Sequence, residues 1–326
     1  MNHPQLSIAF QTDKPLAAYG PLAAAAEAYG FDGVSVFNDL LYQPAWLPLL
    51  EIARATRRVR LGPAAVNPFT CHPLNIAANI ALIDEAAHGR AYLGLARGAW
   101  LDFAGLEPER PAAVLREAFA CVRHLLSRST APLPGEHFPL AGGDALRWPG
   151  IRPDIPFLLG SWGPRTLAAC LPYVEEVKLG GTANPAALRW AREIVGAAPV
   201  RLAVGAVTVV AEDGAAARAL ARREVALYLP VVAELGPGLP LEPARLAAMR
   251  AAAARYDYEA AAGCISDELL DLVCFAGTPE TVADQALALF EAGAGRVEFG
   301  TPHGLSEEDG LRLLGERVLP AIRARL

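Results

Sequence analysis

Short apolar segments alternate with longer alanine- and leucine-rich segments along the whole chain. The short segments, such as VSVF at 34–37, are often β-branched, as expected for buried strands. The longer segments carry helix signals: one stops at Gly30, and another opens at Thr278-Pro279-Glu280. We predict eight strands, at 6–10, 34–37, 59–66, 90–96, 156–160, 174–181, 200–211 and 296–301.

Eight strand–helix repeats predict an α/β fold, a parallel (β/α)8 TIM barrel built as a single domain over residues 1–326. A doubly wound sheet is the alternative, but the segment after the first strand, 11–14, lacks a glycine-rich dinucleotide turn. Residues 128–155 are rich in Pro and Gly and predict an insertion after strand four. Residues 212–277 predict extra helices between strands seven and eight.

The amino-acid composition argues against some classes of binding partner. The formal net charge of −6 argues against nucleic acid, whose binding surfaces are normally basic. The five cysteines form no CxxC pair, which suits a reducing compartment. No apolar run approaches the roughly 18 residues of a membrane span, and MNHPQLSIAF does not resemble a signal peptide. We therefore expect a cytoplasmic protein that acts on a small molecule, without nucleic-acid or membrane partners.

The functional site of a TIM barrel lies at the carboxyl ends of its strands. Asn38-Asp39 follow the second predicted strand, where they form either a hydrogen-bonding or proton-transfer pair or a turn or helix cap. Arg97 ends the fourth strand and binds an anion or a carbonyl, or else forms a surface salt bridge. The full set of strand-end candidates is Gln11, Asn38, Asp39, Asn67, Phe69, Arg97, Ser161, Trp162, Thr182, Thr301 and His303.

Three further segments each allow two interpretations of their role. GSWGPRT at 160–166 and LGGTANP at 179–185 predict anion nests at helix N-termini, or plain βα turns. Lys178 lies within strand six and forms either a Schiff base or an ion pair with a nearby acid. In AVNPFTCHP at 65–73, His72 is more consistent with a helix cap than with a metal ligand, and no HxH or DxD pair predicts a metal site.

The same segments resemble the luciferase-like monooxygenase superfamily, and within it the coenzyme F420-dependent methylenetetrahydromethanopterin reductase branch. The matching stretches extend in order over nearly the whole chain, and the block around strands three and four is the most specific. They are YGFDGVSVFNDL, RVRLGPAAVNPFTCHP, DEAAHGRAYLGLARG, GSWGPRT and FAGTPETVADQ…VEFGTPHG…LRLLGERVLPAI.

This resemblance implies a barrel whose insertion forms a lid over the site, a cofactor across the strand ends, and a homodimer. The flat ring of the cofactor is expected against a strand-three bulge with a non-proline cis peptide near Ala64-Ala65. The cofactor phosphate is expected on the loops after strands five and six. The resulting cofactor-binding residues are Ala64, Ala65, Asn67, Gly98, Ser161, Gly163, Gly180, Gly181 and Thr182.

Two positions depart from the relatives. Deazaflavin relatives commonly carry Asp-His where this chain has Asn38-Asp39, and some carry a glutamate where it has Arg97. The expected catalytic residues are Asp39, Asn38 and Arg97. We expect an oxidoreductase that transfers hydride between coenzyme F420 and a small organic substrate. The alternatives are an FMN-dependent monooxygenase or reductase, a non-catalytic cofactor-binding paralogue, and a lyase acting through Lys178.

Overall fold

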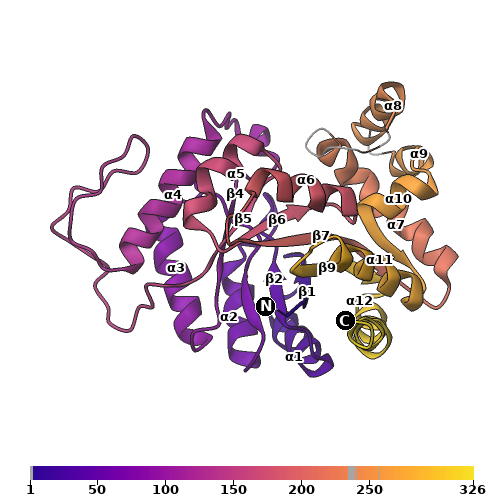
Figure 1. The fold of residues 1–326 in the computed structure, drawn as a ribbon, viewed down its shortest axis with the longest axis horizontal. Coiled ribbons are helices and arrows are strands. Elements are labelled where there is room, and N and C mark those ends of the chain that lie inside the picture. Colours follow the sequence, from indigo (N-terminus) through magenta and orange to yellow (C-terminus); the bar gives the residue numbers. More distant parts are fainter. Residues whose placement is uncertain (1–2, 234–238, 240, 256) are drawn as a thin grey trace.

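The computed structural model shows a parallel barrel wrapped by helices (Figure 1) and describes residues 3–233, 239, 241–255 and 257–326. The eight barrel strands are those that the sequence predicts, although β3 and β4 are shorter than the predicted segments. They are β1 (Gln5–Phe10), β2 (Gly33–Val36), β3 (Arg60–Pro63), β4 (Leu93–Ala96), β5 (Phe157–Gly160), β6 (Glu176–Gly180), β7 (Arg201–Val210) and β9 (Arg296–Gly304).

The sheet closes on itself. Its strand order is β3-β2-β1-β9-β7-β6-β5-β4, and bridges at Leu61–Ala91 and Val66–Leu95 join the β3 and β4 sides. Because every strand pair is parallel, all carboxyl ends meet at one end of the barrel, here called the mouth. The amino ends meet at the other end, here called the floor. The predicted TIM barrel is confirmed.

The barrel is covered by helices whose ends carry the predicted signals. Gly30, at φ 93°, ends α1, and the Thr278 side chain caps α11 by accepting from the Thr281 N–H. His72 caps α3 by accepting from the Leu74 N–H at 3.1 Å, as predicted. The covering helices are α1 (Tyr19–Tyr29), α2 (Trp46–Ala55), α3 (Pro73–Ala86), α4 (Pro111–Leu126), α5 (Pro164–Cys170), α6 (Pro185–Val195), α11 (Pro279–Glu291), α12 (Glu307–Leu313) and α13 (Leu319–Arg323).

Between β7 and β9 the chain forms the predicted extra helices and one strand that the sequence analysis missed. The helices are α7 (Gly214–Val232), α8 (Pro243–Ala253), α9 (Tyr258–Gly263) and α10 (Asp267–Val273). The strand β8 (Cys274–Gly277) pairs with the last four residues of β7, outside the barrel path. It follows α10 without an intervening residue, so no turn signal marks it. These elements bury a second apolar cluster that includes Val209, Leu229, Met249 and Leu270.

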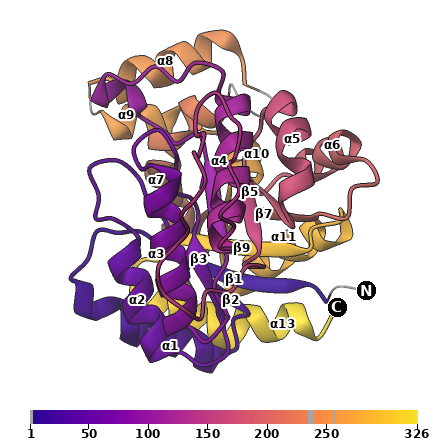
Figure 2. The ribbon, with the colours of Figure 1, turned by 90° about the vertical axis from the view of Figure 1, so that its left-hand side faces the viewer.

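The insertion at 128–155 is present but does not cover the mouth, which corrects the expected lid. It follows α4, whose end lies toward the floor, and it extends along the outside of α3 and α4 (Figures 1 and 2). Phe138 packs edge-on against His72 at the start of α3, with ring centroids 5.3 Å apart. Arg152 then returns to the end of α3, where it donates to Asp84 at 2.7 Å. These contacts hold the insertion against the outside of α3, from its start at His72 to its end near Asp84.

Candidate active site

The mouth brings side chains from four separate segments together. Gln11, which follows β1, donates from Nε2 to the Oδ2 of Asp39 at 2.9 Å. Tyr228, on α7, interacts with Gln11, and its ring packs edge-on against Trp100, with centroids 5.9 Å apart. Gln11 and Asp39 are candidates from the sequence. Tyr228 is not, because nothing in the local sequence indicates that α7 docks over the mouth.

Asp39 is the acid of this group, and its surroundings favour the protonated form. Burial raises the pKa of the Asp39 carboxyl, while the hydrogen bond from Gln11 and the charge of Lys178 oppose that shift. A carboxyl with a raised pKa exchanges a proton more readily near neutral pH than an ordinary one. The side chain therefore has the chemistry that proton transfer requires.

Asn38 serves a different purpose from its neighbour. Its Oδ1 accepts from the Ala45 N–H at 3.0 Å, directly before α2 begins at Trp46. This is the turn alternative, in which the side chain bonds to the backbone of its own loop, since no side chain caps α2. The amide oxygen of Asn38 thus fixes the loop that carries Asp39.

The loop after β3 has the backbone path that the resemblance implies. The Ala64-Ala65 peptide bond is cis. The buried Asn67 accepts from the N–H groups of Phe69 and Thr70 through one oxygen, at 3.0 and 2.9 Å. A Cβ at Gly98, where φ is +85°, would lie 2.9 Å from the Asn67 Nδ2. Glycine at 98 therefore lets the ends of β3 and β4 approach closely.

Arg97 projects from the same strand end. Its side chain is exposed, and it forms no ion pair with any residue that the structure describes. The surface salt bridge offered as the alternative is therefore not seen among those residues. A guanidinium without an internal acid is available to an anion or a carbonyl group from outside.

The turns after β5 and β6 contact each other. Trp162 donates from its indole nitrogen to the Gly180 carbonyl at 3.0 Å, and Ser161 Oγ accepts from the Gly163 N–H at 3.1 Å. Gly180 is exposed, and a Cβ placed there would meet nothing within 4 Å. No side chain caps α5, so this helix start leaves backbone N–H groups for an anion.

In the turn after β6, most polar groups already form hydrogen bonds within the protein. The buried Thr182 donates to the Leu272 carbonyl at 3.3 Å and accepts from the Asn184 N–H at 3.1 Å. The Gly181 N–H, at φ +73°, donates to the Gly205 carbonyl at 2.7 Å. Asn184 caps α6. Thr182 and Gly181 therefore shape the turn, and their polar groups are already used within the protein.

Lys178 lies inside the barrel and is paired with an acid, as its ion-pair interpretation predicts. Its ammonium group contacts Glu298, which Arg296 also contacts at 2.6 Å. A Schiff base needs a neutral, accessible amine, and this lysine is buried beside a carboxylate. The lyase alternative loses its support.

His303 is buried at the end of β9, after the cis Thr301-Pro302 bond. Its ring lies edge-on to Phe10, Nε2 contacts the Ala9 carbonyl at 3.1 Å, and Nδ1 makes no hydrogen bond among the described residues but lies 3.9 Å from Glu307. Burial lowers the pKa of His303 to about 4, so the ring is neutral at physiological pH. It packs beneath the mouth.

The described residues show neither a cluster of metal ligands nor a helix suited to crossing a membrane. No group of three or more His, Cys, Asp or Glu side chains there is placed to hold a metal ion. None of the described helices combines the length and the apolar character needed to cross a membrane.

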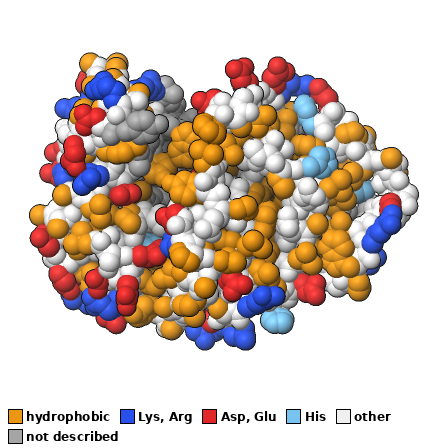
Figure 3. Space-filling view, turned by 180° about the vertical axis from the view of Figure 1, so that it is seen from behind, with side chains coloured by type: hydrophobic (Ala, Val, Ile, Leu, Met, Phe, Trp, Pro, Cys, Tyr) orange, Lys and Arg blue, Asp and Glu red, His pale blue; other side chains and the backbone are white. Residues whose placement is uncertain are grey.

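The mouth lies on the face shown in Figure 3, opposite to the view of Figure 1. Hydrophobic side chains gather over the middle of this face, and charged side chains lie mainly around its edge. The loops after β2 and β4 add the exposed Leu41, Tyr42, Trp100 and Phe103. An apolar surface with a few polar groups is typical of a small-molecule site.

A parallel barrel with an acid, an arginine and glycine-rich turns at its strand ends belongs to the class of TIM-barrel enzymes. Within that class, a sequence model described as "Luciferase-like monooxygenase" matches residues 4–296, and the chain belongs to this family.

Individual relatives agree with this family. A 5,10-methylenetetrahydromethanopterin reductase from Archaeoglobus fulgidus is 26% identical over 315 residues, covering 91% of this chain and 93% of the relative. The solved coenzyme F420-dependent tetrahydromethanopterin reductase from Methanopyrus kandleri superposes with a TM-score of 0.87 at 24% identity, covering 98% and 99% of the two chains. An F420-dependent secondary alcohol dehydrogenase gives 0.75 at 17% identity, covering 98% and 99%.

Proposed function

We propose that this protein is a coenzyme F420-dependent oxidoreductase that moves hydride between the deazaflavin and a small organic substrate at the barrel mouth. The observation that carries the proposal is the partly buried Asp39, held by Gln11 beside an apolar, aromatic surface. The full-length similarity to methylenetetrahydromethanopterin reductases supports the choice of cofactor.

The residues at the mouth fit a flat ring with an anionic tail. Ala64, Ala65 and Gly98 present backbone and small side chains beside Asn67, and such a surface accepts a planar group at close range. The exposed Gly180 and the uncapped start of α5 after Gly163 offer N–H groups for a phosphate. Ser161, Gly181 and Thr182 hold the two turns in place.

When bound, coenzyme F420 supplies the hydride chemistry, and the protein supplies orientation and proton handling. Asp39 holds or moves a proton at its carboxyl group. Arg97 binds an anionic or carbonyl group of the substrate. Tyr228 and Trp100 form an aromatic wall on one side of the site. Asn38 positions the Asp39 loop by accepting from the Ala45 N–H.

Separate titrations of the purified protein with coenzyme F420 and with FMN, followed by fluorescence quenching, test the cofactor. We expect tight binding of F420 and weak binding of FMN. The reverse result would assign the chain to the FMN-dependent alternative and make oxygen consumption the next assay. Binding of neither would contradict both oxidoreductase proposals.

We also infer that the protein is a cytoplasmic homodimer. Leu47 on α2 and Leu74 and Leu82 on α3 are exposed, and exposed apolar side chains on neighbouring helices favour an interface. The five cysteines are all free thiols, which suits a reducing compartment. Light scattering after size exclusion tests the dimer, and a monomer at micromolar concentration would contradict it.

A further inference from the structure

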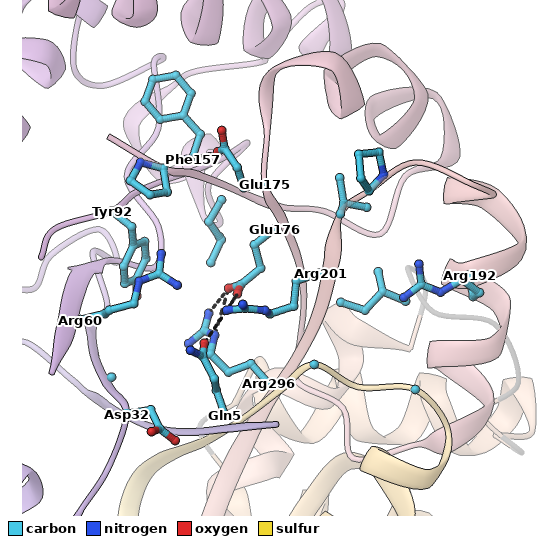
Figure 4. A pocket seen from close by; sticks show the side chains of 18 residues that line it. Gln5, Asp32, Arg60, Tyr92, Phe157, Glu175, Glu176, Arg192, Arg201 and Arg296 are labelled. Carbon is cyan, nitrogen blue, oxygen red and sulfur yellow. Dashed lines mark hydrogen bonds and ion pairs between the residues drawn. The ribbon is translucent and has the colours of Figure 1, made fainter. Parts of the chain in front are cut away.

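A cavity of about 700 Å³ opens at the floor of the barrel, at the opposite end from the proposed active site (Figure 4). The starts of most barrel strands contribute to its lining, among them Gln5 on β1, Arg60 on β3, Glu176 on β6 and Arg296 on β9. The proposed oxidoreductase mechanism uses none of these residues.

Part of the charge at the floor is internally paired. Arg296 lies between two acids and donates from Nε to Glu176 at 2.9 Å and from Nη1 to Glu298 at 2.6 Å. Glu298 also pairs with Lys178. These four side chains are buried, and their charges balance.

Arg60 and Arg201, two of the other arginines that line the cavity, lack full partners. The guanidinium of Arg60 lies over the Tyr92 ring, with Cζ 5.7 Å from the centroid, and points into the cavity (Figure 4). It makes no hydrogen bond or ion pair with any residue that the structure describes. Arg201 bonds to Gln5 and lies 3.7 Å from Glu176, but its buried Nε has no partner among the described residues.

The remaining acidic side chains of the lining do not neutralise the positive charge of Arg60 and Arg201. Asp32 accepts from the Leu6 N–H at 2.8 Å and lies 3.8 Å from Arg323. Glu175 accepts from the Phe157 N–H at 2.6 Å and lies 3.6 Å from Arg123. Both carboxylates point away from the arginine cluster (Figure 4).

The interior of the floor therefore holds a surplus of positive charge. Four basic side chains, namely Arg60, Lys178, Arg201 and Arg296, face two acids, Glu176 and Glu298. Burial lowers the pKa of Arg60, Glu176 opposes this shift, and Arg296 and Arg201 add to it. A partly buried cation without a counter-charge is costly, and a bound anion removes that cost.

We propose that the floor cavity is a binding site for a small oxyanion, a carboxylate or a phosphate, held between Arg60 and Arg201. The guanidinium of Arg60 retains all of its donors, and its planar fork matches a carboxylate or phosphate in two-point contact. Arg201 adds a second positive charge to the lining. The Tyr92 ring supports Arg60 from one face and fixes the direction of the fork.

The test is a calorimetric titration of the full-length protein with inorganic phosphate and, separately, with acetate, each against sodium chloride at matched ionic strength. Three variants accompany the wild type. Arg60→Gln removes the free cation, Arg60→Lys keeps the charge but loses the fork, and Arg54→Gln removes an exposed arginine of α2 that does not line the cavity. Circular dichroism confirms that each variant is folded.

We expect saturable binding of at least one probe by the wild type and by Arg54→Gln, weakened about tenfold or more in Arg60→Gln. Arg60→Lys is expected to bind more weakly than the wild type. Without anion, Arg60→Gln should melt no lower than the wild type, because it removes an unpaired charge.

Several results would overturn the proposal. They are binding of neither probe beyond the chloride control, full affinity retained in Arg60→Gln, or an unchanged affinity in Arg60→Lys. If phosphate bound at the mouth instead, its affinity would be the same in Arg60→Gln as in the wild type, and this result would also overturn the proposal. The F420 titration reports on the other end of the barrel, so failure of one proposal is distinguishable from failure of the other.

Discussion

The mouth and the floor are formed by the same eight strands, yet they differ in how their polar groups are held. At the floor, Arg296 lies on a strand, is fully buried and bonds to two acids within the sheet. At the mouth, Asp39 and Arg97 lie on loops, Asp39 is only partly buried, and Arg97 is exposed. The strand residue Arg296 belongs to a rigid charged core, whereas the loop residues Asp39 and Arg97 remain available to a ligand.

This difference shows where mutations should act. A group that is enclosed by partners contributes mainly to stability, because removing it leaves those partners buried and unpaired. A group at the mouth has fewer partners to lose, so its removal should affect chemistry more than folding. Substitutions of Glu298 at the floor and of Asp39 at the mouth test this difference directly.

The largest effect is expected from Glu298→Gln. The change removes the charge that pairs with both Lys178 and Arg296, and breaking a buried pair costs about 3–5 kcal/mol. Urea denaturation measures the loss. Glu316→Gln is the control, because Glu316 is half exposed and should change stability by less than about 0.5 kcal/mol. Similar losses of stability in the two variants would show that the buried Glu298 contributes no more than a surface acid.

The same carboxylate makes the floor sensitive to acid. Lys178 and Arg296 hold the pKa of Glu298 below the ordinary value of 4.5, against the effect of burial. A carboxyl with a lowered pKa in the folded state stabilises the protein fully above the unfolded value, and this contribution is lost as the pH falls below it. We expect the wild type to lose more stability than Glu298→Gln between pH 5 and pH 3, since the variant has no such carboxyl.

Asp39→Asn should have the largest effect at the mouth. If the carboxyl transfers a proton, turnover should fall about 10²–10⁴-fold, while the dissociation constant for F420 stays within about threefold. Steady-state kinetics, followed by the absorbance of F420, and the fluorescence titration separate the two effects. Asp102→Asn, at an exposed acid in the loop after β4, is the control. Normal turnover in Asp39→Asn would disprove the proton-transfer role.

The dependence of activity on pH tests the same role of Asp39. Because burial raises the pKa of Asp39, the carboxyl stays protonated to a higher pH than an exposed aspartate. Activity that depends on the acid form should therefore decline as the pH rises through this raised value. A profile that is flat from pH 4 to pH 8 would indicate that another group transfers the proton.

The sequence predicts the barrel well because each strand–helix unit is a local pattern. The alternation of apolar segments, Gly30 after α1 and the Thr278 cap of α11 all depend on residues close together in the chain. Strand-end candidates such as Asp39 and Asn67 follow from the barrel itself, since its carboxyl ends meet at one place. The cis Ala64-Ala65 bond is expected only from the family resemblance, because the local sequence does not predict it.

Features that depend on distant packing are not visible in the sequence. Tyr228 reaches the mouth because α7 docks there, and the insertion at 128–155 turns away because Phe138 and Arg152 hold it against α3. The surplus charge at the floor appears only when Arg60 and Arg201, from strands far apart in the chain, face one cavity. β8 is missed because four residues directly after a helix carry no alternation.

A smaller effect is expected from Gly98→Ala, for which the chain offers a close control in Gly143→Ala. Both glycines have φ +85°, so alanine costs about 1–2 kcal/mol of backbone strain at either position. Only at 98 would the new Cβ contact a neighbour, the Asn67 amide at 2.9 Å, whereas nothing lies within 4 Å at 143. We expect F420 affinity to fall about tenfold in Gly98→Ala alone. Equal affinity in both variants would show that the Asn67 loop does not contact the cofactor.

The smallest effect is expected from Asn38→Ala, which separates support of the loop from catalysis at adjacent residues. The Ala45 N–H loses its acceptor, and loss of one hydrogen bond costs about 1 kcal/mol. Turnover should change by no more than about twofold at a temperature where the variant is folded, because Asp39 retains Gln11. Asn38→Asp keeps an acceptor for the same N–H and should restore the stability. A large loss of turnover in Asn38→Ala, with stability unchanged, would place Asn38 in the chemistry and extend the catalytic group beyond Asp39.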